Sequence, residues 1–491
     1  MKRYTSTTVL QIKRFYVMVV HPGGERPWQS WPNTKRYMKY LCEALGHQDR
    51  HAGFADYSRG LMLPIERKSV EPLAAHTDPL HVSSQHQSLH HVVAMSEWSD
   101  TAVVERVRDW VMARLGHKSK FYWIVDDTGF PKKGTHSVGV ARQYCGQLGK
   151  QDNCQVAVSL SLATEQGSVP IGFRLYLPEK WAKDQRRRKK AGVPQEVKFL
   201  TKPEIALEQI RAAKAAGVAV GIVLADAAYG NDTSWREELS EIELEYCVGV
   251  QSSTTVWSKG TGPLPPKPQK RMGRPPTRWR RGPGATPLSV KALAESVKAR
   301  RWHTVNWREG SHAVLSSRFA ALRVRAAHRD EKRKTLREQG WLLIEWPTGE
   351  PEPTKYWLAT LPADTALVEL VRVAKMRWRI ERDYQELKQE FGLSHYEGRN
   401  WRGFHHHATL CVAAYGFLLA DRLKHGGSKK NSTRSKTPFL PADYTPRGSP
   451  TRATSRARLH RHAALPSGLG DRQKTPSMPL LQRGESILLT Q

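Results

Sequence analysis

Acidic side chains that could hold a metal ion follow two apolar segments of this sequence. FYWIV is followed by Asp126 and Asp127, and GIVLA is followed by Asp226. In α/β folds ligands gather at the carboxyl ends of strands, so acids placed there can face one site. A third acid, Glu381, lies on a long predicted helix. Three converging carboxylates suit a hard divalent cation such as Mg²⁺, which prefers oxygen ligands.

Two such ions about 4 Å apart can activate an attacking hydroxyl and stabilise the leaving oxygen of a phosphodiester. The structural alternative is that an aspartate at a strand end caps a turn or a helix.

On the predicted helix, Arg377, Glu381, Tyr384 and Lys388 follow one another at steps of four, three and four residues, so they share one face. A solvated, salt-bridged face is the alternative interpretation of that pattern.

The charge of the chain indicates a polyanionic partner. Its 491 residues include 78 Lys and Arg against 46 Asp and Glu, a formal charge of +32, which favours nucleic acid. No apolar run approaches the roughly 20 residues that span a bilayer, and the N-terminus lacks the features of a signal peptide. The five cysteines form no C-x-x-C pair and fit reduced thiols. We therefore expect a soluble, intracellular protein without a membrane partner.

The elements that position the acids are predicted from periodicity. Strand, hairpin, helix and strand follow one another from FYWIVDD to LADAAYG, an order that predicts an α/β core with a mixed sheet. The helix KPEIALEQIRAAKAAG has Gly217 where a C-cap belongs. TALVELVRVAKMRWRIERDYQELKQEFG is predicted to form one long helix that ends at Gly392, and FHHHATLCVAAYGFLLADRL a further helix.

These patterns divide the chain into five parts. Residues 1–115 are predicted to be a helical N-terminal DNA-binding region, and 116–250 the first part of the core. Residues 251–350 are a β-rich insertion with a basic Pro/Gly loop, and 351–426 are the second part of the core with the glutamate-bearing helix. Residues 427–491 hold 12 Lys and Arg against 3 Asp and Glu, and are predicted to be a disordered basic tail.

The segment RWRIERDYQELK has the pattern R-x₃-E-x₆-K. It resembles the Y-x₂-R-x₃-E-x₆-K signature of a large group of DDE-type insertion-sequence transposases. Ala374 stands where that signature has tyrosine. Further segments resemble the insertion-sequence-701 branch of this group, over about residues 10–425: ERKSVEPLA, DDTGFPKKG, YLPEKWAKDQRRRKKAGVP, LADAAYG and GLSHYEGRNWRGFHHHATL.

The resemblance implies an RNase H-like core with the catalytic, metal-binding triad Asp126, Asp226 and Glu381, which lie 100 and 155 residues apart. Asp126 is preferred because Asp126-Asp127-Thr128 matches D-x-T in the family pattern, and Asp127 stays the alternative. The cofactor would be two Mg²⁺ or Mn²⁺ ions. The predicted DNA-binding residues are Arg377, Lys388, Lys132, Lys133, Arg274 and Arg278.

Three basic or histidine-rich segments have open interpretations. Gly273-Arg274-Pro275 resembles the centre of an AT-hook, although Met272 replaces an arginine, and a general phosphate-binding loop is the alternative. The run Arg186–Lys190 is either a solvated patch or a contact to the DNA backbone. The consecutive residues His405–His407 point in different directions on a helix, so they do not form one zinc site.

The predicted function is that of a transposase. It would bind the terminal inverted repeats of its insertion sequence, hydrolyse the phosphodiester at each end and join the 3′-OH to target DNA, as a homodimer at the bacterial nucleoid in the cytoplasm. Two alternatives stay open. One is a structure-specific nuclease on the same core, and the other is an inactive, decayed transposase that still binds DNA.

Overall fold

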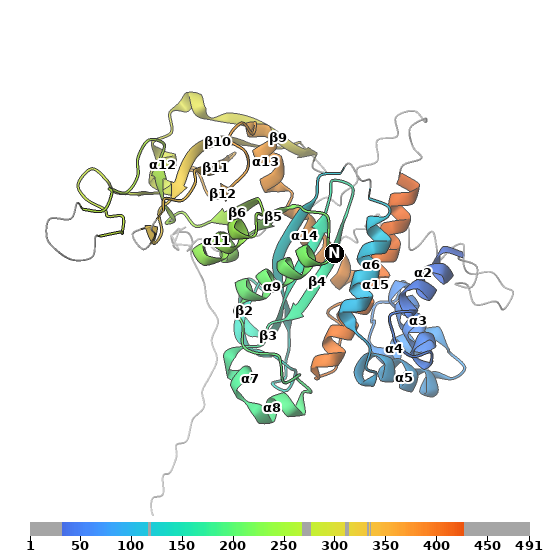
Figure 1. Cartoon of the computed structure of the whole chain (residues 1–491). Helices are drawn as coiled ribbons and strands as arrows, with labels where there is room; N and C mark the ends of the chain where they lie inside the picture. The colour runs from blue at the N-terminus through green and yellow to red at the C-terminus, as the bar shows by residue number, and fades with distance from the viewer. Residues whose placement is uncertain are drawn as a thin grey trace, which may run out of the picture. The chain divides into compact units, whose positions relative to one another are not determined.

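The structure is a computed structural model, and it describes residues 32–115, 119–267, 276–309, 314–330, 333 and 335–426 (Figure 1). Three predicted features lie outside these residues: the first 31 residues of the helical region, the AT-hook-like segment with Arg274, and the tail 427–491. The described residues belong to one compact unit. The domain boundaries given above therefore stay predictions.

A twelve-stranded sheet has the order β2-β3-β1-β5-β6-β12-β11-β10-β7-β8, with β4 beside β3 and β9 beside β10. Its strands are β1 Tyr122–Pro131, β2 Ala141–Cys145, β3 Lys150–Ala163, β4 Ser168–Leu175, β5 Ile222–Ala225, β6 Tyr246–Val250, β7 Thr255–Ser258, β8 Leu288–Ser289, β9 His303–Glu309, β10 Val314–Ala326, β11 Gly340–Pro347 and β12 Lys355–Ala359.

Five strands form the predicted core in the order β4-β3-β1-β5-β6. Strands β1, β3 and β4 are antiparallel neighbours, whereas β5 runs parallel to β1 and β6 parallel to β5. The parallel strands β1 and β5 must be joined by a crossover. The last part of that connection, from β4 to β5, contains α9 (Lys202–Ala215). This mixed α/β arrangement is the RNase H-like core that the sequence predicted.

The strands of the insertion continue the core sheet. Strand β12 pairs with β6 on one side and with β11 on the other, and β10, β7 and β8 follow. The sequence predicted a partly β insertion that interrupts the core. Its strands are present, and they are hydrogen-bonded into the same sheet as the core strands.

Helices precede, connect and follow the strands. Before β1 the described residues form α2 Pro32–Cys42, α3 Asp49–Met62, α4 Val70–Thr77, α5 Val82–His90, the π-helical turn η2 His91–Met95 and α6 Asp100–Met112. The later helices are α7 Glu179–Lys183, α8 Gln185–Lys190, α9, α10 Ala227–Gly230, α11 Thr233–Glu241, α12 Val290–Glu295, the 3₁₀ turn η3 Ala299–Arg301, α13 Leu367–Lys375, α14 Trp378–Gln389 and α15 Trp401–Gly426.

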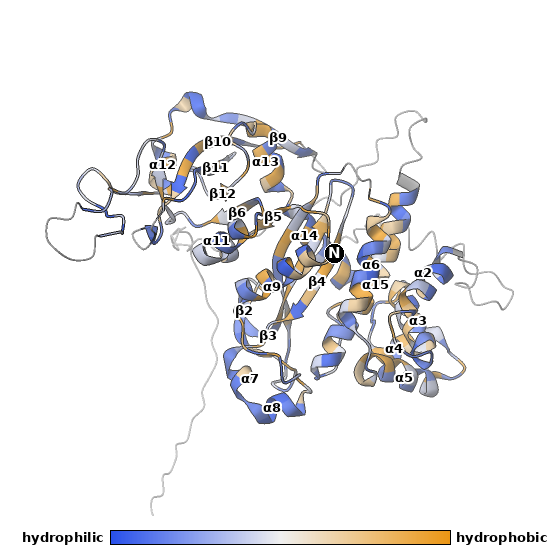
Figure 2. Cartoon of the chain, in the orientation of Figure 1, coloured by the Kyte–Doolittle hydropathy of each residue, from blue (hydrophilic) through white to orange (hydrophobic). Residues whose placement is uncertain are grey.

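Two predicted helices are confirmed in detail. Helix α9 starts with a capping box between Thr201 and Glu204, and Gly217 behind its end has a φ of +68°. Every residue of α15 from Gly403 to Ala420 is buried, and hydrophobic residues run along it (Figure 2). A helix buried on all sides is a central core element. No helix of the described residues is long and apolar enough to span a membrane.

The prediction of one long helix over 365–391 is wrong. Helix α13 ends at Lys375 and α14 begins at Trp378. The turn between them is tightened, because the amides of Arg379 and Ile380 bond carbonyls only three residues back. No Gly or Pro stands in this segment before Gly392, so the sequence carries no signal of the break.

Candidate active site

Strand β1 directs alternate side chains into two hydrophobic cores. Tyr122 and Ile124 pack in the core that contains α13 and the first half of α14, whereas the residues between and after them pack with α9. Because neighbouring side chains of a strand point to opposite faces, Asp126 lies on the side of α14 and Asp127 on the side of α9. The two adjacent acids therefore belong to different environments.

The register of the parallel strands brings Asp226 beside Asp126. Ile124 pairs with Leu224 on the neighbouring strand, and neighbouring strands lie about 4.8 Å apart. Two residues later, Asp126 lies on β1 and Asp226 directly follows the end of β5. Asp226 also caps α10, since its Oδ1 accepts a hydrogen bond of 2.9 Å from the Ala228 amide. Both the capping role and the strand-end placement that the sequence suggested are thus present in one residue.

Arg377 joins two of the three acids. Its Nη1 donates to Oδ2 of Asp126 at 2.7 Å, and its Nη2 donates to Oε1 of Glu381 at 3.1 Å. Burial raises the pKa of Asp126 to about 7, the Arg377 guanidinium opposes this shift, and the neighbouring Asp226 adds to it. Burial acts to lower the pKa of Arg377, but Asp126, Glu381 and Asp226 together raise it above its ordinary value. Asp126 and Glu381 therefore contact one guanidinium, and Asp226 acts on it electrostatically.

Asp127 has a different partner. Its Oδ2 accepts a hydrogen bond of 2.8 Å from Nζ of Lys202, at the start of α9. This ion pair lies on the face of the sheet opposite to α14. The geometry therefore favours Asp126 over Asp127 as the member of the acidic group. Asp127 instead forms an ion pair with Lys202.

The predicted face of α14 lies along β1 and β3. The hydroxyl of Tyr384 shares a hydrogen bond of 2.7 Å with Oγ of Ser159, which is the β3 residue opposite Asp126. One turn further, Nζ of Lys388 donates to the Gly129 carbonyl at 2.7 Å. Burial lowers the pKa of Lys388 to about 8.

The other predicted DNA-binding residues lie further from the acids. Nζ of Lys132, just beyond β1, donates to the Tyr396 carbonyl at 2.9 Å, and burial lowers its pKa. Lys133 is exposed. Arg278 is exposed in the segment between β7 and β8, and Arg274 is outside the described residues.

A residue of the insertion approaches the acids and was missed from the sequence. Burial lowers the pKa of Arg308 on β9, and the negative charge of Glu381 partly opposes this shift. Its guanidinium carbon lies 4.6 Å from the ring centre of Trp378. Only the tertiary pairing of β9 with β10 places it there, so no local pattern could have found it.

The positions of possible metal ligands are constrained by Arg377. Among the residues that the structure describes, no three His, Cys, Asp or Glu side chains are close enough to hold one ion. The guanidinium lies between the carboxylates of Asp126 and Glu381 instead, so a cationic group already fills that place.

The three consecutive histidines have three different partners. His405 receives the Leu175 amide, His406 bonds the Trp98 carbonyl, and His407 bonds the Gly392 carbonyl. Burial lowers the pKa of His406 and His407 to about 4. They are neutral core residues that tie α15 to its surroundings. The five cysteines, all of which are described, are free and buried.

Comparison with known proteins decides the family. A family model described as "DDE superfamily endonuclease" matches residues 40–314. The chain belongs to the DDE superfamily of endonucleases. The matched range of this DDE endonuclease contains Asp126 and Asp226 and stops before Glu381.

A curated relative agrees with the motifs in the sequence. Over 171 residues the DDE endonuclease is 34% identical to a protein of Microchaete diplosiphon named "Probable transposase for insertion sequence element IS701". The alignment covers 35% of this chain and 42% of that relative, so the chain spans less than half of the relative's length. The predicted resemblance to insertion-sequence-701 transposases is confirmed.

Proposed function

We propose that this DDE endonuclease is a transposase that cleaves DNA at the ends of its own insertion sequence and joins the released 3′-OH to target DNA. The observation that carries the proposal is the convergence of Asp126, Asp226 and Glu381 around Arg377. Asp126 and Glu381 contact the same guanidinium, and Asp226 follows the strand beside β1. The name of the Microchaete relative supports transposition as the class of reaction.

The three acids would form the donor set for two Mg²⁺ or Mn²⁺ ions once Arg377 no longer lies between Asp126 and Glu381. All three offer carboxylate oxygens, which hard divalent cations prefer. Burial and the repulsion from Asp226 raise the pKa of Asp126, so its carboxylate gains from any cation beside it. Arg377 provides that cation in the structure, and it would leave the position between Asp126 and Glu381 when metal is held there. The ions would supply a nucleophilic hydroxide and stabilise the leaving oxygen.

The chain's own groups would orient the acids and the DNA. The hydrogen bond between Ser159 and Tyr384 links β3 to α14 beside Asp126. Arg377, freed from the carboxylates, would donate to phosphate oxygens in the forked geometry that guanidinium groups favour. We assign Lys388, Lys132 and Lys133 to the DNA backbone as well. Lys388 would exchange the Gly129 carbonyl for a phosphate, which an ammonium binds more strongly because the interaction is charge-assisted.

The partners follow from this assignment. We propose that the protein binds terminal inverted repeats and target DNA in the bacterial nucleoid, and that two copies hold the two ends of the element. Arg278 and Arg274 on the segment between β7 and β8 would contribute further backbone contacts.

The test uses the full chain and DNA that carries the sequences flanking its coding region. With Mg²⁺ or Mn²⁺ we expect cleavage that leaves a 3′-OH, followed by joining to a supercoiled plasmid. Glu381→Gln should abolish both steps, while Glu369→Gln, which removes a surface acid from the neighbouring helix α13, should leave them intact. Cleavage without joining would identify a nuclease. Binding without cleavage by the wild-type chain would identify an inactive transposase.

A further inference from the structure

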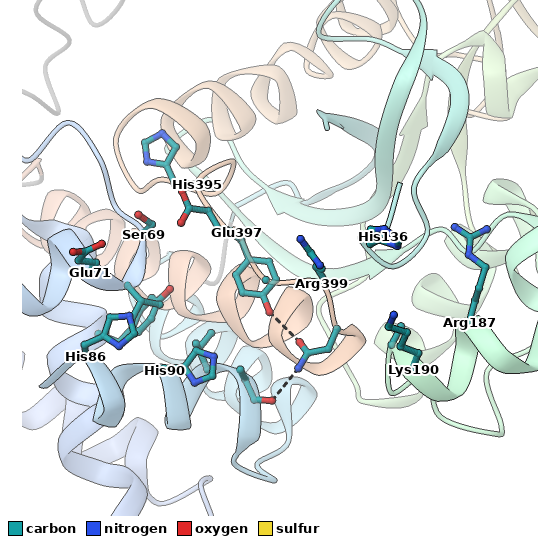
Figure 3. A pocket seen from close by; sticks show the side chains of 18 of the residues that line it. Ser69, Glu71, His86, His90, His136, Arg187, Lys190, His395, Glu397 and Arg399 are labelled. Atoms are coloured by element: carbon teal, nitrogen blue, oxygen red, sulfur yellow. Dashed lines mark hydrogen bonds between the residues drawn. The ribbon is translucent and has the colours of Figure 1, made fainter. Parts of the chain in front are cut away.

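A basic cleft lies beyond the end of β1, away from the acids. It has a volume of about 480 Å³ and is bordered by α4, α5 and η2 on one side and by α8 on the other (Figure 3). Arg187 and Lys190 reach it from α8, Arg399 from the segment before α15, and His136 from the β1–β2 connection. We propose that this cleft binds the phosphodiester backbone of DNA, an inference that takes its substrate class from the proposed function.

The cleft is built by hydrogen bonds between distant segments. The amide of Val138 donates to the Arg399 carbonyl at 3.0 Å, and the amide of Trp401 donates to the Ala191 carbonyl at 2.8 Å. On the opposite wall, Nδ2 of Asn400 donates to the Ala94 carbonyl at 3.2 Å. The segment before α15 is thus fastened to the β1–β2 connection, to the end of α8 and to η2, so the walls are in place before a ligand arrives.

The cations of the cleft are available for an anion. Arg187 is oriented by its stacking on Trp181, with the guanidinium carbon 3.7 Å from the ring centre, and by a hydrogen bond of 3.1 Å to the Thr135 carbonyl. In the part of the chain that the structure describes, Arg187, Lys190 and Arg399 take part in no ion pair. Fixed guanidinium groups without a carboxylate partner are suited to phosphate oxygens.

The acids that line the cleft do not cancel this charge. Two carboxylates line it, Glu71 and Glu397, and Glu397 is ion-paired with Arg67. The three cations therefore leave an excess of positive charge in the cleft. A polyanion gains more from such a site than a neutral ligand does.

A line of cations connects the cleft to the acids. Along β1, Arg377 contacts Asp126, Lys388 contacts Gly129, and Lys132 follows the strand and contacts Tyr396. At about 3.3 Å per residue, the six steps from Asp126 to Lys132 span about 20 Å. This length equals about six base pairs of duplex at 3.4 Å per step. The continuity favours one DNA backbone over a separate small anion.

The experiment measures binding of a 30-base-pair duplex to the full chain by fluorescence anisotropy, in EDTA and at increasing salt. Each phosphate contact adds about 0.9 to the slope of log K against log salt. Arg187→Ala/Lys190→Ala should therefore lower the slope by about two. The matched control is Arg186→Ala/Lys189→Ala, which removes the same charge from exposed positions of the same helix that do not line the cleft. It should change the slope by less than half as much.

Equal slope changes in the two double variants would overturn the proposal, because only diffuse charge would then act. A deoxynucleoside monophosphate is titrated in parallel. If the cleft variant loses this ligand but keeps the duplex slope, the cleft serves a small anion and the proposal fails. Binding in EDTA does not depend on cleavage. A slope change in this assay, together with no cleavage by the wild type in the separate assay with Mg²⁺ or Mn²⁺, would contradict the proposed function and leave the cleft assignment standing.

Discussion

Arg377 stands where the proposed reaction needs a metal cation, and its removal tests that interpretation. Arg377→Met keeps most of the side-chain volume and removes the charge between Asp126 and Glu381. Two unit charges about 4 Å apart attract each other by about 4 kcal/mol at an effective dielectric constant of about 20. The side chains of Asp126 and Arg377 are 16% and 25% exposed, so solvent and the recovered desolvation energy reduce the loss to about 2–3 kcal/mol.

The assay is thermal unfolding with and without divalent metal. For a protein of this size about 1 kcal/mol corresponds to about 1 °C, so the variant should melt about 3 °C lower in EDTA. A cation at about ten times its dissociation constant stabilises the folded state by about 1.4 kcal/mol. In the wild type the metal ion must first displace the Arg377 guanidinium. Mg²⁺ or Mn²⁺ should therefore raise the melting temperature of the variant more than that of the wild type.

The control is Arg372→Met, which removes a cation from α13 that is 52% exposed. Exposed ion pairs contribute little, so its melting temperature should change by less than about 1 °C and its response to metal should equal that of the wild type. Equal metal stabilisation of wild type and Arg377→Met would refute the idea that the guanidinium and the metal compete for one place.

Three further predictions follow from single contacts. Asp126→Asn should abolish cleavage of element-end DNA and Asp127→Asn should retain it; the opposite result would reassign the first acid. Burial lowers the pKa of Lys68 to about 8, so its contribution to stability is present above about pH 10.5 and is lost as pH falls through 8. Between pH 7 and 10 the wild type should gain about 2 kcal/mol relative to Lys68→Met in denaturant titrations, and parallel curves would contradict this. Tyr384→Phe leaves Oγ of Ser159 without its partner and should cost about 1–3 kcal/mol of unfolding free energy, whereas an unchanged midpoint would refute the hydrogen bond.

The sequence predicted the acids, but only the family resemblance, and not the strand pattern, separated Asp126 from Asp127. FYWIVDD is apolar before its acids because β1 is buried on both faces, and such a strand shows no alternation from which a face could be assigned. The D-x-T pattern favoured Asp126, and the packing of α14 supports the same residue. The pairing of Asp127 with Lys202 joins residues 75 positions apart, which no local pattern encodes.

The sequence also did not predict that the strands of the core and of the insertion form one continuous sheet. The strand at Lys355–Ala359 was predicted to re-enter the core, and it does pair with β6. On its other edge the same strand pairs with β11 of the insertion. Hydrophobic patterns identify individual strands. They do not show which strands pair when the two strands lie about a hundred residues apart in the sequence.

The break before Trp378 places Arg377 at the beginning of α14. A continuous helix was expected because the apolar period runs through the break without a Gly or Pro. Tertiary contacts decide the geometry instead, since Arg377 bonds Asp126 on β1. The basic cleft is a similar case, because its cations come from segments that are separate in the sequence.

Metal ligation by the triad is the central claim, and a ligand exchange at Asp226 tests it most directly. Asp226→Cys replaces a hard oxygen ligand by a softer thiolate, which holds Mg²⁺ poorly and Mn²⁺ better. We predict that this variant cleaves element-end DNA in Mn²⁺ but not in Mg²⁺, and that Asp226→Ala cleaves in neither. Equal cleavage by Asp226→Cys in both metals, or any cleavage by Asp226→Ala at the wild-type rate, would contradict the assignment of this carboxylate to the metal.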